Sequence, residues 1–549
     1  MQILPSNIIK YKKFKLGSIN FFFKNKILIV TLLLVLSFIS FYFIIDFSSQ
    51  SLVAHDEGLY ARRARLIEYS DNWFSPPFSS PHHKTLGSYW FIALSIKLFG
   101  NSELSLRLPS IISSFLCLIS SYLIALKIST KKSALVSLFS LSSMPLWIQY
   151  SRYASPDIPF VLSILLVILF FLKSLDSPDH MRQNFYIFLS GFFVSTSFFI
   201  RSYMAFVPLI GLAPFIFFHL YRKEYISKIL FCIGIFIGSI PTSLNLYFSA
   251  KKFGNIGITA LFDFARKQAV GDSIFNNLFV VPLNFLYLTF PIGILVLILF
   301  VFTRSNFRVK YPLLIYCYPL LSLILLLCMS TSYPHYYLVL LPSLSIIFAN
   351  YISSYTFRYS FSRSTIKYLL VIIILLVSII LLFSIINYKD LVTQYTYGNP
   401  LIVYLLSLFI VLSYFSSIRF LLDFNHFGFN LIKFLYNIII PQYISLSLLY
   451  NFGVLGNPNY KTKLFLNDDA TSSIFNFNTI YLFNVDSKTK TLLSYYLPSS
   501  KVVDDFEVIT NYKYIITSNI NSLAKLDLQQ LFIPIKKFDN HLLLVNISK

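Results

Sequence analysis

The chain has 549 residues, of which 56% are hydrophobic and only 12% are charged. A soluble domain carries about 25% charged residues, and the mean hydropathy of this chain is +0.69. This composition cannot cover a protein of this size with polar surface, which excludes a cytosolic enzyme, a disordered tail protein and a soluble nucleic-acid binder; it predicts an integral membrane protein.

The formal net charge is +23, from 45 Lys and Arg residues against 22 Asp and Glu residues. The basic residues lie between apolar runs and form no stripe of the kind that binds nucleic acid. Loops that face anionic lipid have this pattern, so we predict membrane lipids and no nucleic acid as partners. The four Cys residues fall inside apolar runs without CxxC spacing, which predicts small buried thiols.

In chain order, a basic N-terminal segment (1–26) precedes the first apolar run of spanning length. No small-residue cleavage site follows that run, so we interpret it as a membrane helix and not as a signal peptide. The predicted transmembrane domain covers 27–453 and contains about thirteen helices. Their approximate spans are 27–47, 108–126, 133–151, 157–175, 184–200, 203–220, 228–248, 278–302, 311–330, 334–354, 367–387, 400–418 and 434–452.

Loop charges orient these spans. The segments that would share a side with the N-terminus carry most of the Lys and Arg residues of the loops, which places that side in the cytoplasm. We therefore predict a multi-pass protein of the cell (inner or plasma) membrane. With an odd number of spans, the C-terminus lies outside.

The composition changes in residues 454–549. Short β-type runs (479–485, 514–517 and 541–547) are separated by turn formers. We predict a small α/β domain on the outer face, either facing an acceptor or stabilising the rest of the chain. The complete expectation is a mainly α, polytopic membrane protein with this domain appended.

The first outer loop, 48–107, is dense in polar groups. Asp56 to Tyr69 has helical spacing, with Leu59 and Leu66 on one face and arginines around the other, which predicts a helix in the interface plane. An acidic pair, Asp56-Glu57, at the end of a membrane helix is costly unless it is paired or used. The alternative explanation for the acidic pair is that it begins a helix in contact with water, where Asp and Glu are favoured by capping and by the helix dipole.

A second acidic residue, Asp157, starts the fourth span in a loop too short for a solvated patch. Two carboxylate sites at one level can form a polar cavity, in which Lys84 and arginines would bind an anionic headgroup. Arg201 would pair with Asp157 or a phosphate, or else extend to the interface. The tyrosines that follow His335, Tyr336 and Tyr337, would be explained without any function by the aromatic belt at a membrane interface.

Several motifs together resemble one family. The residues are Asp56-Glu57-x-x-Tyr60-Ala61-x-x-Ala64-Arg65, an Asn-Trp pair, Lys84 ahead of Tyr89-Trp90, Arg107-Leu108-Pro109-Ser110, and Tyr336-Tyr337-Leu338-x-x-Leu341-Pro342. They are similar to the aminoarabinose transferase and protein O-mannosyltransferase superfamily of GT-C glycosyltransferases. The match covers about residues 25–350, most specifically 54–110.

The resemblance implies a glycosyltransferase that uses a polyprenyl-phosphate sugar donor on the outer face, with inversion, toward a lipid, glycan or protein acceptor. Asp56 would be the catalytic carboxylate, Asp157 the second acidic residue and Lys84 the ligand of the donor phosphate. The full candidate site groups catalytic Asp56, Glu57 and Asp157; donor-phosphate ligands Lys84, Arg62, Arg65 and Arg201; and substrate contacts Tyr60, His83, Tyr89, His335, Tyr336 and Tyr337.

Two positions depart from the aminoarabinose transferases. Leu59 stands where they have arginine, and His83 stands where they have an acidic residue before the lysine. His82-His83 could bind a divalent metal or form a polar pair near the acceptor, so the metal and the acceptor are left open.

Two other functions would fit the same composition. A transporter or lipid flippase would also have many helices and intramembrane charges. Transporters often have repeated halves and broken helices near the midplane, whereas the charges of this sequence cluster at the outer surface and its halves do not repeat. A non-catalytic polymer-assembly protein would share the outer loops without requiring Asp56. The loop 249–277 could be a mobile flap or an ordinary surface loop.

Overall fold

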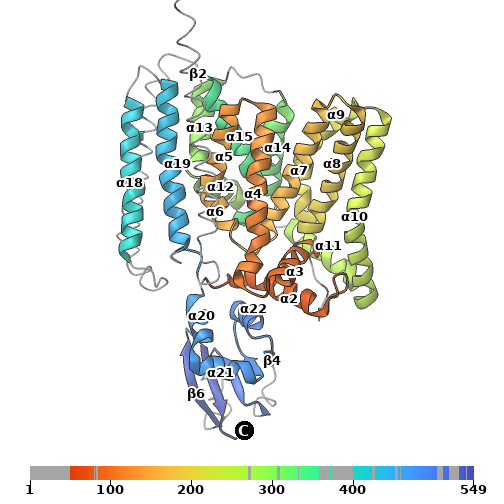
Figure 1. The fold of residues 1–549 in the computed structure, drawn as a ribbon, viewed down its shortest axis with the longest axis vertical. Coiled ribbons are helices and arrows are strands. Elements are labelled where there is room, and N and C mark those ends of the chain that lie inside the picture. The colour runs from red at the N-terminus through yellow and green to blue at the C-terminus, as the bar shows by residue number, and fades with distance from the viewer. Residues whose placement is uncertain are drawn as a thin grey trace, which may run out of the picture. The chain divides into compact units, whose positions relative to one another are not determined.

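The computed structural model of this protein combines a helical, membrane-embedded domain with a small domain built on a sheet (Figure 1). Two predicted segments, 1–26 and 27–47, lie outside the described residues, as does nearly all of 367–387. The described residues are 50–78, 81, 84–269, 274–305, 310–331, 333–357, 368, 371–372, 375, 400–422, 427–451, 455–457, 459–503, 511–518, 531–538 and 541–548.

The first loop contains three helical segments. A π-helix, η1 (Ala54–Gly58), continues directly into α2 (Leu59–Ser70), and α3 (Gly87–Phe99) follows an irregular stretch. The sequence predicted the helix around α2 but not α3, whose thirteen residues fall short of a membrane span.

The buried face of α2 differs from the predicted one. Leu59 and Leu66 are only partly buried. The helix packs against α3 and against α22 (Ser487–Tyr496) of the C-terminal domain, and small side chains permit this close approach. The residues buried on α2 are Tyr60, Ala61, Ala64 and Ile67.

Four helical stretches in the described part of the chain are long and apolar enough to cross a membrane. One of them is α8 (His180–Arg201) joined to α9 (Phe206–Tyr221) through the 3-10 turn η2 (Ser202–Ala205). They coincide with the predicted spans between 108 and 248, except for 133–151. The other three are α4 (Glu103–Ile128), α7 (Asp157–Asp176) and α10 (Tyr225–Phe253).

Two predicted spans are divided by proline. The run 133–151 forms α5 (Lys131–Ser143) and α6 (Pro145–Tyr150), because Pro145 has no amide hydrogen to continue the helical hydrogen bonds. The run 278–302 forms α12 (Ile274–Leu288) and α13 (Ile292–Phe302), separated near Pro291.

The predicted spans 311–330 and 334–354 begin with helical turns that are wider or tighter than an α-helical turn. The π-turn η3 (Leu313–Cys317) leads into α14 (Tyr318–Leu327). The 3-10 helix η4 (Pro334–Leu340) leads into α15 (Leu341–Ser354). With these interruptions, the number of spans remains a prediction. The last two predicted spans are α18 (Pro400–Leu422) and α19 (Phe427–Asn451).

Residues 249–277, for which the sequence left a flap and a surface loop open, are largely helical. Helix α10 continues to Phe253, and α11 (Ile256–Ala269) follows after a turn. A short antiparallel pair also joins β1 (Thr303–Ser305) to β2 (Tyr355–Phe357).

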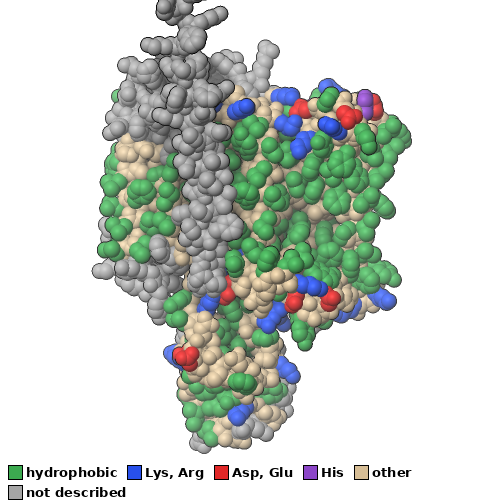
Figure 2. Space-filling view, viewed as in Figure 1, with side chains coloured by type: hydrophobic (Ala, Val, Ile, Leu, Met, Phe, Trp, Pro, Cys, Tyr) green, Lys and Arg blue, Asp and Glu red, His purple; other side chains and the backbone are tan. Residues whose placement is uncertain are grey.

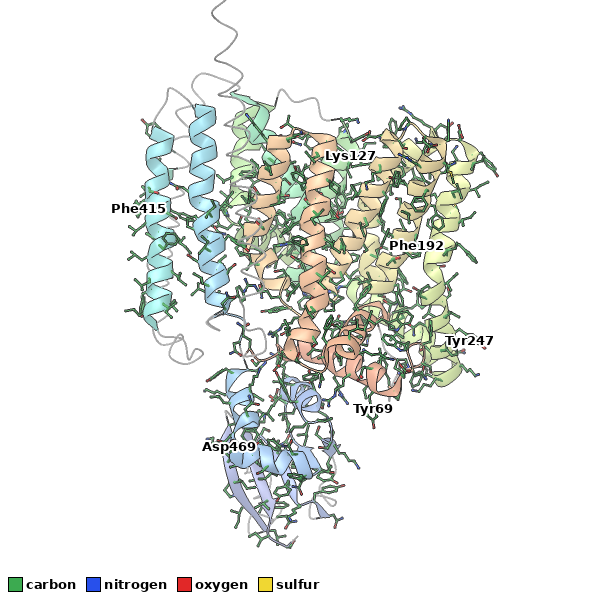
Figure 3. The ribbon with its side chains drawn as sticks, in the orientation of Figure 1. Tyr69, Lys127, Phe192, Tyr247, Phe415 and Asp469 are labelled. Atoms are coloured by element: carbon green, nitrogen blue, oxygen red, sulfur yellow. The ribbon has the colours of Figure 1, made fainter. Side chains whose placement is uncertain are left out.

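Charged side chains gather at the two ends of the helical domain, and hydrophobic side chains cover the flank between them (Figure 2). Lys127 and Tyr69 lie at opposite ends of the helical domain (Figure 3). Buried Cys117 fits the prediction for cysteine. That prediction is wrong for Cys232, which is exposed on α10, and for Cys328, which is exposed in the turn after α14, although all four thiols are free.

The C-terminal domain has a five-stranded sheet in the order β4-β3-β5-β7-β6. Strand β3 pairs in parallel with β4 and β5, whereas β7 pairs antiparallel with β5 and β6. The three predicted β-type runs are β3, β5 and β7. The strands are β3 (Ile480–Phe483), β4 (Lys501–Val503), β5 (Tyr514–Thr517), β6 (Phe532–Phe538) and β7 (His541–Asn546), and the remaining helices are α20 (Tyr460–Asn467) and α21 (Asp469–Phe477).

Candidate active site

The π-helix η1 carries the first predicted catalytic residues. Asp56 lies in this helix, but its side chain is outside the described residues, as are His82 and His83 in full. Its neighbour Glu57 is completely buried. A π-helical turn is rare in proteins and occurs often at functional sites.

Glu57 and Arg107 form a buried, two-pronged ion pair. Arg107 donates from Nε to Glu57 Oε1 at 2.9 Å and from Nη2 to Oε2 at 2.8 Å. Each carboxylate oxygen accepts one more bond, Oε1 from the Ala154 amide at 2.8 Å and Oε2 from the Val53 amide at 2.9 Å. The pair thereby connects η1, α4 and the segment that leads into α7.

A second polar cluster joins α7, α8 and α2. Asp157 begins α7 and forms an ion pair with Arg201, the last residue of α8, at 2.8 Å. Arg201 Nη1 also donates to Tyr60 Oη at 3.2 Å, and Lys84 Nζ donates to the same oxygen at 3.0 Å. The structure therefore brings together four predicted site residues from four parts of the sequence.

The charges of the described side chains in this cluster do not balance. Asp157 neutralises Arg201, whereas no described carboxylate lies within ion-pair distance of Lys84. Burial lowers the pKa of Lys84; the Tyr89 hydroxyl opposes this shift and the Arg201 guanidinium adds to it. Among the described side chains Lys84 is thus a partly buried cation without a counterion, an arrangement that an anion would stabilise.

Aromatic rings and a further arginine support the cluster. The rings of Tyr60 and Tyr89 lie 5.2 Å apart, and Arg63 donates to Tyr89 Oη at 3.0 Å. The two arginines of α2 that were predicted to bind phosphate have no bond to Tyr60, Lys84 or Arg201 among the described contacts. Arg62 is exposed, and Arg65 donates to the Tyr495 carbonyl oxygen of the C-terminal domain at 2.7 Å.

The 3-10 helix η4 closes one side of the Asp157–Arg201 pair. His335 and Tyr336 line a small cavity together with both members of this pair. Tyr150 Oη lies 3.4 Å from His335 Nδ1. Tyr337 is fully buried, and its ring packs against Phe285. Of the three predicted substrate contacts in this segment, only His335 and Tyr336 border the cavity.

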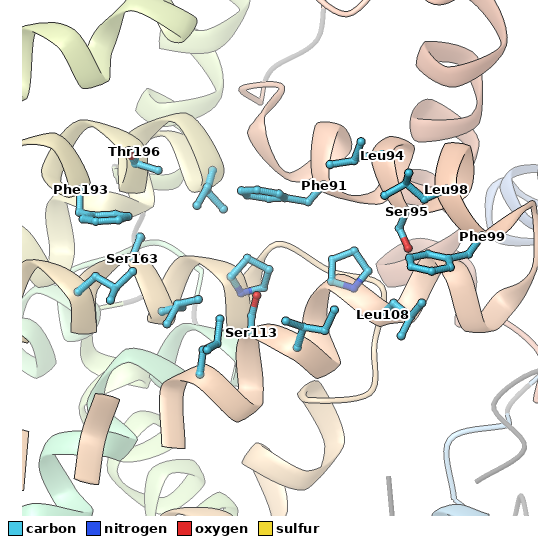
Figure 4. Close-up of a pocket in the computed structure, with 17 residues that line it drawn as sticks. Phe91, Leu94, Ser95, Leu98, Phe99, Leu108, Ser113, Ser163, Phe193 and Thr196 are labelled. Carbon is cyan, nitrogen blue, oxygen red and sulfur yellow. The ribbon is translucent and has the colours of Figure 1, made fainter. Parts of the chain in front are cut away.

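An apolar groove of about 340 Å³ lies between α3, α4, α7 and α8. Figure 4 shows Phe91 and Leu98 of α3 on one side of the groove and Leu108 and Ser113 of α4 on the other. The groove includes Ile200, which immediately precedes Arg201, so it adjoins the polar cluster. A groove of this size and polarity suits a hydrocarbon chain.

Metal binding is not decided by the described residues. They contain no group of three or more His, Cys, Asp or Glu side chains that could hold a metal ion. The histidine pair and the Asp56 side chain are not among them, so a divalent metal remains a prediction.

The sequence did not identify Arg107 as a functional residue. It is among the largest fully buried side chains, and it pairs with a glutamate fifty positions away. Its presence in the Arg-Leu-Pro-Ser motif was the available signal. Arg63 and Tyr150 were also missed, because neither stands in a motif that assigns a contact.

The sequence comparisons find relatives of the region that carries these residues. Residues 83–248 match the family model described as dolichyl-phosphate-mannose-protein mannosyltransferase. The undecaprenyl phosphate-alpha-4-amino-4-deoxy-L-arabinose arabinosyl transferase of Pseudomonas aeruginosa is 25% identical over 187 residues, or 33% of this chain and 34% of that protein. The enzyme of that name from Pseudomonas savastanoi is 30% identical over 130 residues, 23% of this chain and 24% of that protein. These matches thus span about a quarter to a third of the relatives' length.

The structural comparison extends over the whole fold. The crystal structure of ArnT from Cupriavidus metallidurans bound to undecaprenyl phosphate has a TM-score of 0.74 and 14% sequence identity, covering 95% of this chain and 98% of that one. The apo structure gives a TM-score of 0.71. Residues 83–248 are therefore similar in sequence to a glycosyltransferase family, and the fold of the chain is similar to that of ArnT.

Proposed function

We propose that this chain, which shares the fold and the motif-bearing region of GT-C membrane glycosyltransferases, transfers a sugar from a polyprenyl-phosphate donor to an acceptor. The observation that carries the proposal is the convergence of Lys84 and Arg201 on Tyr60 Oη. Two cations that meet at one oxygen beside a single described carboxylate form a receptor for a phosphate group. The similar ArnT of Cupriavidus metallidurans binds undecaprenyl phosphate in its crystal structure, which supports the same donor class here.

In this proposal the donor phosphate replaces Tyr60 Oη as the acceptor for the two cations. Lys84 and Arg201 would stabilise the negative charge that grows on the phosphate as the bond to the sugar breaks. Asp157 would hold Arg201 in place through their 2.8 Å ion pair. The hydrocarbon chain of the donor would lie in the apolar groove beside α7 and α8.

Asp56 would act as the catalytic carboxylate by accepting a proton from the acceptor hydroxyl or by orienting an anionic acceptor. Attack opposite the departing phosphate inverts the configuration at the sugar carbon. Glu57, grouped with the catalytic residues at first, would instead position its neighbour, because four hydrogen bonds engage its two oxygens. The reaction would take place on the outer face of the cell membrane, where the C-terminal domain would also lie.

The experiment is mass spectrometry of lipids and envelope glycans from a strain that lacks this gene. Complementation uses the wild type, Asp56→Asn, Lys84→Met and, as a matched control, Lys132→Met, which removes an exposed lysine at the start of α5. We expect the wild type and Lys132→Met to restore one sugar modification that the two site variants do not restore. This modification would identify the sugar and the acceptor together.

Restoration by Asp56→Asn to the wild-type level would remove this carboxylate from the mechanism. Restoration by all variants would favour a transporter or a scaffold in place of a transferase. The comparisons do not favour the transporter alternative, since the similar proteins are named as transferases.

A further inference from the structure

Residues 50–53 lie outside helices and strands. Gln50, Ser51 and Leu52 are buried nonetheless. Buried backbone N–H and C=O groups need partners, and a segment outside helices and sheets must obtain them largely from side chains. The identity of those side chains therefore shows what holds the segment in place.

Part of the support comes from the membrane domain. Arg107 Nη2 donates to the Ser51 carbonyl oxygen at 3.0 Å. The Val53 amide donates to Glu57, and the Val53 carbonyl accepts from the amides of Glu57 and Gly58 at 2.8 and 3.1 Å. Val53 is thus the N-cap residue of the π-helix that contains Asp56, and its backbone bonds to that helix.

The rest of the support comes from the C-terminal domain and the residues that lead into it. The Ser51 amide donates to Asn457 Oδ1 at 2.9 Å. Asn459 Nδ2 donates to the Leu52 carbonyl oxygen at 2.7 Å, and the Leu52 amide donates to Tyr496 Oη at 3.2 Å. Three backbone groups of Ser51 and Leu52 therefore bond to side chains more than four hundred positions away.

Tyr496 is itself held in a defined orientation. Its hydroxyl donates to Glu103 Oε1 at 3.2 Å, and the same carboxylate oxygen pairs with Lys463 at 2.6 Å. Burial raises the pKa of Tyr496, with the Glu103 carboxylate adding to the shift, so the phenol keeps its proton and can donate to Glu103 while it accepts from Leu52.

Packing reinforces these hydrogen bonds. Leu492 and Tyr495 of α22 belong to the same buried cluster as Leu52, Ala54 and Tyr60. The cluster contains the aromatic residue on which Lys84 and Arg201 converge. The C-terminal domain therefore contacts both the segment that leads to Asp56 and helix α2, which contributes Tyr60 to the cation pocket formed by Lys84 and Arg201.

We propose that the C-terminal domain positions the catalytic segment, with Asn457, Asn459 and Tyr496 as positioning residues for Asp56. The inference rests on the proposed function for its catalytic consequence. These side chains do not touch Lys84 or Arg201 among the described contacts, so they act on the placement of the carboxylate and not on the capture of the donor phosphate. Misplacing a catalytic group by about 1 Å can cost about a hundredfold in rate.

The first test measures amide hydrogen exchange in the full-length protein in detergent, followed by mass spectrometry of a peptide covering 50–58. The variants are Tyr496→Phe, which removes one hydroxyl group, and Asn459→Ala. The matched control is Tyr481→Phe, the same change on β3 of the same domain, where the ring stacks on Tyr512. We expect faster exchange in this peptide for the two variants and wild-type exchange for the control.

The second test measures transfer with purified enzyme and a polyprenyl-phosphate sugar. For Tyr496→Phe we expect kcat to fall about tenfold per folded molecule while the KM for the donor stays within about twofold. A role confined to folding would lower the yield of folded protein and leave kcat unchanged.

The outcomes separate the two proposals. Unchanged exchange in Tyr496→Phe and Asn459→Ala, or faster exchange with an unchanged kcat, overturns the positioning role. A wild-type protein without transfer activity contradicts the proposed function, and in that case the exchange experiment still decides whether the C-terminal domain holds the segment.

Discussion

The buried pair of Glu57 and Arg107 allows a quantitative prediction about stability. Their side chains are 0% and 2% exposed, and two charge-assisted hydrogen bonds join them. Removal of one partner leaves the other as an uncompensated charge in a low-dielectric region, at a cost of about 3–5 kcal/mol. We therefore expect Glu57→Gln to lower the free energy of unfolding by about that amount, and Arg107→Met to do the same.

The double variant provides the diagnostic result. With both charges removed, no unpaired ion remains, and the loss should be clearly smaller than the sum of the two single losses. The two backbone amides of Val53 and Ala154 would still lose their charged acceptor, so recovery should be incomplete. The assay is reversible unfolding by SDS in mixed micelles, with helix content as the signal.

A second ion pair serves as the control. Lys97 and Asp71 approach to 2.7 Å, but their side chains are 49% and 69% exposed. Asp71→Asn should cause no resolvable change, because solvent screens exposed pairs. Additive losses in the Glu57/Arg107 double variant, or wild-type stability in either single variant, would refute the view that this pair is buried and coupled.

Three further predictions concern binding and packing. Because burial lowers the pKa of Lys84, its ammonium loses the proton at a lower pH than an ordinary lysine. Binding of undecaprenyl phosphate should therefore weaken as the pH rises through the lowered pKa of Lys84. Because arginine keeps its charge to higher pH, Lys84→Arg should move this loss of binding to higher pH in a fluorescence titration. Leu166→Trp fills the apolar groove and should raise the KM for a donor with a long prenyl chain but not for one with a short chain, as measured by initial rates. A β-carbon at Gly191 would overlap the Phe231 carbonyl oxygen where α8 meets α10, so Gly191→Ala should lower stability by about 1–3 kcal/mol. Gly58→Ala should be tolerated, since its β-carbon would lie 3.7 Å from Leu492.

The sequence predicted the long helices more accurately than the interrupted ones. Helices α4, α7 and α10 follow from uninterrupted apolar runs, whose length alone determines whether they can span a bilayer. The runs that contain Pro145 and Pro291 are just as apolar, so hydropathy could not show that proline divides each into two helices.

For the candidate site, the sequence identified residues at one level of the membrane but not their pairing. The sequence predicted a polar cavity at Asp56 and Asp157 with Lys84, and it left open whether Arg201 pairs with Asp157. The structure pairs Arg201 with Asp157 and joins Arg201 to Lys84 through Tyr60. The partner of Glu57 could not be predicted, because Arg107 lies fifty positions away and nothing local specifies the pairing. The dependence of Leu52 on Asn459 and Tyr496 has even less of a local signal.

The unbalanced charge of the cation pocket connects stability with function. Among the side chains that the structure describes, Lys84 is a partly buried cation without a carboxylate in contact, so it opposes folding until an anion arrives. A ligand that binds only the folded protein stabilises it by about 2.7 kcal/mol at a hundred times its Kd. Undecaprenyl phosphate should therefore raise the midpoint of thermal unfolding of the wild type in detergent. Lys84→Met should unfold at a higher temperature than the wild type without ligand and should lose most of the ligand-dependent increase. If Lys84→Met proved less stable than the wild type without ligand, the lysine would be serving the fold, and the phosphate-binding role would lose its electrostatic basis.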